Sequence, residues 1–165
     1  MASNVDLDDL KPDFILITHA HQDHTLDVEK LAKDNNSLII SNFEIVSHFQ
    51  SKGLNGHPMN HGGKWNFDFG ELKYVNAIHT STFPDGSNGG QPGGFIITSN
   101  NKSIYIAGDT ALTYDMKLIP INYNLDLAIL PIGDNFTMGY KDAMIASDFI
   151  ECNNCLLYTS PSPRD

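Results

Sequence analysis

The order of apolar segments in this 165-residue chain predicts an α/β layered domain with a mixed β-sheet. Two observations predict that fold class. Short apolar runs of strand length recur along the chain, and segments with apolar residues at helical spacing lie between them. The length allows one domain with a sizeable core and is too short to expect two.

The elements of the first part of the chain are justified by their own patterns. Residues 14–17 form a continuous apolar run, typical of a strand buried on both faces. Residues 25–33 carry apolar side chains at helical spacing, and residues 38–40 are a second apolar strand. Asn42 is a suitable N-cap for a helix that ends near Gly53.

The remainder of the chain is richer in strands. Residues 65–69 alternate with period two, which indicates a half-exposed strand, and Gly70 then turns the chain into a strand over residues 72–78. The other expected elements follow from turn sequences, apolar runs and one helical pattern. They are a glycine-rich loop over residues 84–94, a hairpin of residues 95–98 and 104–107, a strand over residues 125–130 and a helix over residues 141–150.

The charge balance limits the partners of the chain. Its formal net charge is −10, with 20 acidic and 10 basic residues, which disfavours nucleic acid and anionic membrane surfaces. The apolar runs are far too short to span a membrane, and the chain opens without a visible signal peptide. Two cysteines do not make a disulfide framework. We therefore expect a cytoplasmic protein with no nucleic-acid or membrane partner.

Three of the seven histidines and an aspartate crowd into the stretch THAHQDH, residues 18–24. His19 and His21 follow directly on the first strand, and alternate residues of extended backbone point the same way, so they can converge on one point. Asp23 and His24 come where the chain turns toward a helix and can address a second point nearby. Imidazole and carboxylate are the usual ligands of zinc, iron and manganese.

Other predicted strands deliver the same residue types at their carboxyl ends, where sites form in open α/β sheets. His79, Asp109 and Asp134 each follow such a strand. Asp134 has two interpretations that stay open, an orienting partner of a ligand or the cap of a turn. A solvated turn would explain one histidine, but three at this spacing together with His79 and Asp109 favour a metal site.

The motif HxHxDH at residues 19–24 resembles the signature of the metallo-β-lactamase superfamily. The stretches HPMN, GDTAL and LPIGDNFTMG are similar to its uncharacterised metal-dependent hydrolase branch, akin to ascorbate-phosphate lactonase-type proteins. The resemblance extends over residues 5–154. It implies an αββα sandwich fold, here truncated at both ends.

The resemblance also implies a dinuclear metal centre. His19, His21 and His79 correspond to the ligands of a first metal, Asp23 and His24 to ligands of a second, and Asp109 to the carboxylate that bridges them. The cofactors implied are two divalent cations, zinc first, with manganese, iron or nickel as alternatives. The implied enzyme uses a metal-bound hydroxide, with Asp23 and Asp109 in catalytic roles, to hydrolyse an ester, lactone, phosphoester or amide bond of a small molecule.

The chain departs from the family pattern at its end. Members of the family continue after the last helix into a strand with a further histidine of the second metal site, and no histidine follows His79 here. We interpret residues 1–154 as a partial hydrolase domain and residues 155–165, CLLYTSPSPRD, as a non-native or disordered tail. The alternative function is therefore a non-catalytic metal-binding fragment, which binds one metal better than two and hydrolyses little. Cys152 and Cys155 lack the context of a redox or zinc site.

Overall fold

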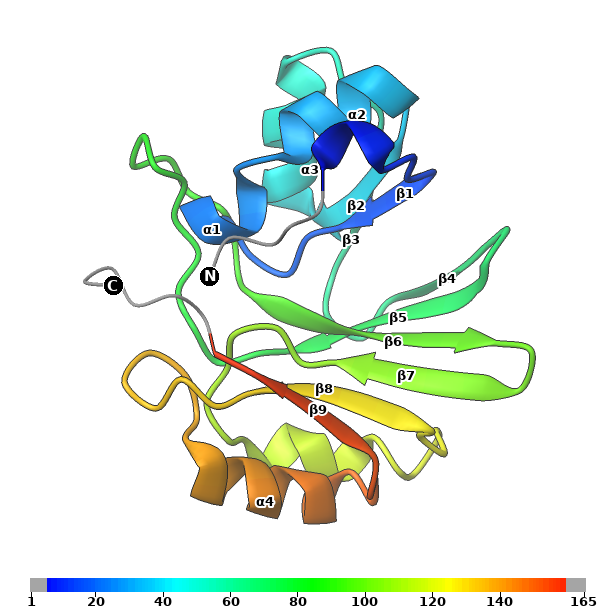
Figure 1. Ribbon diagram of the computed structural model, residues 1–165, viewed down its shortest axis with the longest axis vertical. Coiled ribbons are helices and arrows are strands. Elements are labelled where there is room, and N and C mark those ends of the chain that lie inside the picture. The colour runs from blue at the N-terminus through cyan, green and yellow to red at the C-terminus, as the bar shows by residue number, and fades with distance from the viewer. Residues whose placement is uncertain (1–5, 160–165) are drawn as a thin grey trace.

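The computed structural model describes residues 6–159 as two facing β-sheets with helices on both outer faces (Figure 1). The smaller sheet has three parallel strands in the order β1-β2-β3. These strands are β1 (Phe14–Leu16), β2 (Leu38–Asn42) and β3 (Gly56–Met59).

The larger sheet has six strands in sequence order, antiparallel from β4 to β7 and parallel from β7 to β9. These strands are β4 (Lys64–Phe67), β5 (Gly70–Asn76), β6 (Gly93–Ser99), β7 (Lys102–Ile106), β8 (Leu127–Pro131) and β9 (Cys155–Tyr158). Parallel and antiparallel pairs therefore occur in one sheet, as the sequence predicts.

Helices cover the outer face of each sheet (Figure 1). The smaller sheet carries α1 (Gln22–Thr25), α2 (Val28–Asn35) and α3 (Phe43–Ser51), and the larger sheet carries η2 (Tyr114–Leu118) and α4 (Tyr140–Phe149). A short 3-10 helix, η1 (Leu7–Asp9), precedes β1. The layers follow one another as α, β, β and α, which confirms the predicted sandwich. No helix within residues 6–159 is long and apolar enough to cross a lipid bilayer.

Each interface between layers has its own buried cluster of apolar side chains. The cluster between the two sheets consists of Ile40, Met59, Leu72, Tyr74 and Phe95. A second cluster joins the smaller sheet to α2 and α3, and a third joins the larger sheet to η2 and α4. Since apolar burial is the main favourable term in folding, these clusters hold the strand ends in fixed relative positions.

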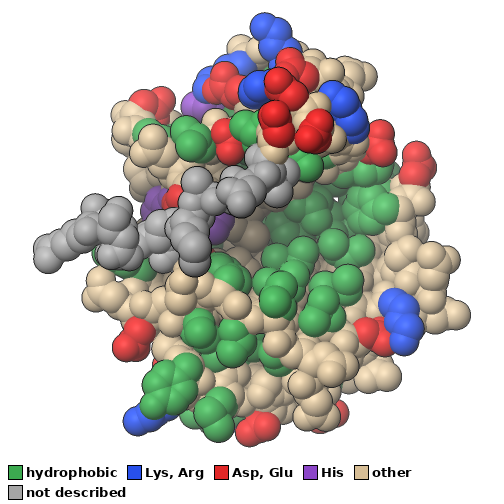
Figure 2. All heavy atoms as spheres, in the orientation of Figure 1, with side chains coloured by type: hydrophobic (Ala, Val, Ile, Leu, Met, Phe, Trp, Pro, Cys, Tyr) green, Lys and Arg blue, Asp and Glu red, His purple; other side chains and the backbone are tan. Residues whose placement is uncertain are grey.

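The two sheets differ in width, so one side of the sandwich is open. Figure 2 shows hydrophobic side chains along the opening between the sheets, with histidines at one end of it. Leu156 and Leu157 of β9 are 57% and 47% exposed. Leu156 is paired with Ile129 of β8, which is half-buried.

The structure corrects two predicted elements in the region of the histidine motif. The run at residues 14–17 was expected to be buried on both faces, but the residues of β1 are only half-buried because β1 is the edge strand of its sheet. The helix expected over residues 25–33 begins later, as α2 at Val28, and α1 is a separate helical turn that precedes it. His24 lies on this separate turn.

The last strand corrects the predicted tail. Cys155–Tyr158 form β9, which pairs in parallel with β8, so the expectation of disorder from residue 155 is wrong for these four residues. Both leucines of β9 are largely exposed. A four-residue edge strand with exposed side chains lacks an alternation of apolar and polar residues, so hydrophobic periodicity does not reveal it. The end of the predicted tail, residues 160–165, lies outside the described residues.

Candidate metal centre

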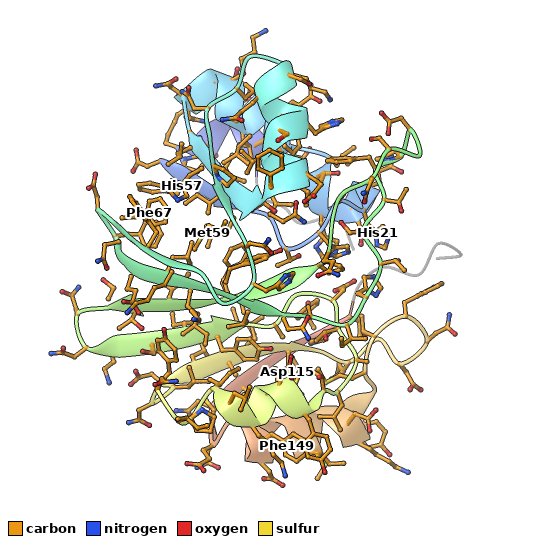
Figure 3. All side chains as sticks on the ribbon, turned by 180° about the vertical axis from the view of Figure 1, so that it is seen from behind. His21, His57, Met59, Phe67, Asp115 and Phe149 are labelled. Atoms are coloured by element: carbon orange, nitrogen blue, oxygen red, sulfur yellow. The ribbon has the colours of Figure 1, made fainter. Side chains whose placement is uncertain are left out.

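The histidine motif lies where the chain leaves β1. Ile17 still continues the ladder through its amide, which donates to the carbonyl oxygen of Ile40 (3.0 Å), and His19 and His21 follow before α1 begins. Figure 3 shows His21 at one end of the two sheets, with His57 and Phe67 at the opposite end. The site is therefore built at the carboxyl end of β1, where the sequence places it.

A first cluster contains three imidazoles from segments some sixty residues apart. One ring nitrogen from each of His19, His21 and His79 lies within 4.8 Å of the others. The ring centroids of His19 and His21 are 4.7 Å apart, and the ring of His79 is 5.0 Å from each. The structure thus brings together the three residues predicted for the first metal.

A second cluster consists of His19, His24 and Asp109, whose ligand atoms also lie within 4.8 Å of one another. His24 Nε2 is 3.5 Å from Asp109 Oδ2. His19 belongs to both clusters, whereas the sequence predicts Asp109 as the shared residue. Asp23 is in neither cluster; its carboxylate lies 3.4 Å from His24 Nε2, and its side chain is 43% exposed.

The surroundings of His19 fit a bound cation. The residue is fully buried, and its Nδ1 lies 3.0 Å from Thr18 Oγ1. Its Nε2 is buried and has no hydrogen-bond partner among the described residues. An unsatisfied buried nitrogen costs free energy, and coordination of a divalent cation removes that cost. Burial, with a smaller contribution from His24, lowers the pKa of His19 to about 3, so its imidazole is neutral and able to coordinate a metal at pH 7.

The two neighbouring histidines respond differently to their surroundings. Burial lowers the pKa of His79, although the charge of Asp109 opposes the shift. Burial also acts against the charged form of His24, but its hydrogen bond to Asp109 and the charges of Asp109 and Asp23 together raise its pKa. A proton therefore competes with a metal at His24 more strongly than at His19 or His79.

Known proteins that are similar to this chain are described as metal-dependent hydrolases. Residues 3–151 match the family model of the beta-lactamase superfamily domain. A relative described as a UPF0173 metal-dependent hydrolase, from Christiangramia forsetii, is 67% identical over 152 residues, which are 92% of this chain and 67% of the relative. The chain belongs to the UPF0173 family.

Two further proteins extend the comparison. A UPF0173 metal-dependent hydrolase from Flavobacterium johnsoniae is 66% identical over 95% of this chain and 70% of its own length. The structure of Igni18, a metallo hydrolase from Ignicoccus hospitalis, superposes with a TM-score of 0.82 at 31% identity, covering 92% of this chain and 65% of that one. This UPF0173 chain thus spans about two thirds of the length of these relatives.

Two polar contacts at the centre were not predicted from the sequence. Tyr158, the last residue of β9, donates from its hydroxyl to Asp109 Oδ1 (3.1 Å). Burial and then the charge of Asp109 raise the pKa of Tyr158, so the phenol keeps the proton that it donates. Thr80 Oγ1 lies 3.3 Å from His21 Nε2. Tyr158 was not predicted because residues 155–165 were assigned to a tail. The family pattern, in which a strand follows the last helix, was the signal that could have identified it.

Other polar residues considered in the sequence lie apart from the clusters. Asp134 is exposed, with a left-handed φ of 67°, in the loop before α4, and Gly139 caps that helix. Cys152 is buried and Cys155 half-buried, both as free thiols. Burial and the neighbouring Cys152 raise the pKa of Cys155, which disfavours a reactive thiolate. None of these three residues is in the two clusters of potential metal ligands found among residues 6–159.

Proposed function

We propose that this UPF0173 protein is a metal-dependent hydrolase whose two clusters hold two divalent cations, zinc first. Its proposed ligands are the residues of the two clusters, His19, His21, His24, His79 and Asp109, together with Asp23, which lies beside His24. The observation that carries the proposal is His19, a fully buried neutral imidazole that belongs to both clusters and whose Nε2 has no hydrogen-bond partner among residues 6–159. A buried donor atom in this position supports a metal role better than a structural one.

Different side chains of the site would have different roles in hydrolysis. The four imidazoles and the carboxylate of Asp109 would hold the cations, and such cations would acidify a water molecule and polarise the bond to be cleaved. His24 and Tyr158 contact opposite oxygens of Asp109 and fix its orientation. Asp23 is exposed beside His24 and can accept a proton at its carboxylate from the attacking water.

The substrate class follows from the reaction that such a centre supports. We propose an ester, lactone, phosphoester or amide bond of a small molecule. The motifs similar to ascorbate-phosphate lactonase-type proteins favour a lactone as the first substrate to test. The name "metal-dependent hydrolase" of the UPF0173 relatives agrees with hydrolysis and specifies no substrate.

A second candidate function is metal binding without turnover by the chain as given. One observation favours it: an oxygen of Asp109 is bonded by the Tyr158 hydroxyl, a protonated donor and therefore a poor ligand. Under this alternative the first cluster, with its three imidazoles, binds one cation well, while the second cluster binds weakly.

We expect the chain to hydrolyse at least one substrate in a panel of lactones, carboxylic esters, phosphodiesters and amides. This hydrolysis should require added metal. Chelation should abolish turnover, zinc or manganese should restore it, and His21→Ala should reduce it by more than about 100-fold, because a lost ligand costs more than the 10–100-fold typical of an outer partner. His57→Ala is the matched control, since His57 packs on Trp65 and Phe67 far from the site. Turnover that survives both chelation and His21→Ala would contradict the proposal. Bound metal without turnover would favour the second candidate.

A further inference from the structure

One hydroxyl group joins the two segments that carry the three imidazoles of the first cluster. Ala20 lies between His19 and His21 and is fully buried. Its amide donates to Ser81 Oγ over 3.1 Å, and Ser81 follows His79 by two residues. Ser81 is itself buried, at 7% exposed. The bond therefore connects the backbone of two ligands directly to the segment of the third.

The orientation of this hydroxyl is fixed by its second bond. Because Ser81 Oγ accepts from the Ala20 amide, its own proton is available for the carbonyl oxygen of Gly89, 2.9 Å away. The Gly89 amide donates a hydrogen bond of 2.9 Å to the Ser81 carbonyl oxygen. Ser81 thus connects the segment of His19 and His21, which we call the ligand segment, to the glycine-rich loop.

The loop is in turn anchored on the smaller sheet. Asn42, the N-cap of α3, accepts a hydrogen bond from the Ile45 amide and donates to the carbonyl oxygens of Gly89 (2.7 Å) and Gln91 (3.0 Å). The amide of Gly93 donates to the carbonyl oxygen of Thr18, directly before His19. The loop is therefore connected to the backbone before His19 through Gly93, and to the backbone after His19 through Ser81.

The contact between loop and ligand segment leaves no space for a larger residue. A Cβ atom added at Gly89 would lie 2.2 Å from Ala20 Cβ and 2.5 Å from Ser81 Oγ. Glycine at position 89 is therefore required by the close approach of the two backbones. The spacing between the segment of His19 and that of His79 is set by this packing together with the Ser81 bonds.

The imidazoles have few side-chain partners of their own to fix them. His19 Nδ1 contacts the Thr18 hydroxyl at 3.0 Å, and His21 Nε2 contacts the exposed Thr80 hydroxyl at 3.3 Å. A metal centre needs its ligands held by surrounding groups within a fraction of an ångström. Here the support for His21 comes largely through the backbone that Ser81 fixes.

We propose that Ser81 is a positioning residue of the metal centre, whose hydroxyl fixes the His19–His21 segment relative to His79. This inference rests on the proposed metal-binding function. Removal of the hydroxyl would leave the buried Ala20 amide without its acceptor and free the two segments to move apart. Cation affinity should then fall although every ligand is still present.

The test is Co²⁺ binding to the metal-free chain, followed by visible absorption, since the Co²⁺ spectrum reports both affinity and ligand geometry. Ser81→Ala is expected to weaken binding about 10–100-fold and to alter the spectrum, as losses of outer partners do. Ser81→Thr, which keeps the hydroxyl, should bind nearly as wild type. Ser87→Ala is the matched control, because Ser87 is an exposed serine of the same loop whose hydroxyl donates to the carboxylate of Asp85.

The outcomes separate this inference from the proposed function. Wild-type affinity and spectrum in Ser81→Ala would overturn the role of Ser81, even if the variant unfolds at a lower temperature, because a purely structural serine would affect stability alone. If Ser81→Ala does not fold, Ser81→Cys gives the same comparison with a much weaker hydrogen-bonding group. A wild-type chain that binds no Co²⁺ would overturn the metal centre and the role of Ser81 with it.

Discussion

Replacing His19 by glutamine is expected to abolish cation binding at both clusters. His19 is the residue that the two clusters share, so its loss removes a ligand from each at once. Its buried Nε2 has no hydrogen-bond partner among residues 6–159, and glutamine places no imidazole there. We expect zinc affinity to fall by more than about 100-fold, beyond the 10–100-fold loss seen for outer partners of a ligand.

Competition of zinc with a chromophoric chelator measures this loss. His48→Gln is the matched control, because His48 stacks on Phe83 at a centroid distance of 3.9 Å and belongs to neither cluster. The control should bind zinc as wild type does. If His19→Gln retains wild-type affinity, His19 is not a ligand and the two clusters are not joined through it.

The metal-free protein is expected to lose stability as the pH falls from about 6.5 toward 3. An unfolded histidine titrates near pH 6.5, whereas burial and the nearby His24 lower the pKa of folded His19 to about 3. Between these values the unfolded chain takes up a proton that the folded chain excludes, so the free energy of unfolding decreases with decreasing pH. For His19 alone the loss is on the order of 4 kcal/mol.

The other histidines of the site modify this expected loss. The lowered pKa of His79 acts in the same direction as that of His19. The raised pKa of His24 acts in the opposite direction, since its stabilising contribution is present in acid and is lost as the pH rises through the folded pKa. Urea unfolding of chelated protein at several pH values measures the sum. His19→Gln should flatten the curve between pH 6.5 and 4, and an equally steep curve in that variant would show that other groups cause the acid sensitivity.

The sequence predicted the main parts of the site because their signals are local. His19 and His21 alternate directly after an apolar run, and a strand end is recognisable from a few residues. His79 and Asp109 follow recognisable strands in the same way. The layers of the fold were predictable for the same reason, since most strands are short apolar runs between turn residues.

The remaining features depend on contacts between distant segments, which no local pattern contains. The β3 strand was not predicted because it includes Gly56 and Pro58, and proline is tolerated there only because β3 is an edge strand. The sharing of His19 by two clusters depends on how α1 turns His24 back toward it. The bond from Ala20 to Ser81 joins residues 61 positions apart, and both are ordinary small residues in the sequence.

X-ray absorption at the zinc edge of the zinc-loaded chain measures directly whether histidines bind the metal. We expect only nitrogen and oxygen ligands, at about 2.0–2.2 Å, with the scattering pattern of several imidazoles. The described chain offers one competing type of ligand in Cys152 and Cys155, whose thiolates would bind zinc at about 2.3 Å. A sulfur shell at that distance, or a spectrum without imidazole scattering, would contradict a metal centre built on His19, His21 and His79.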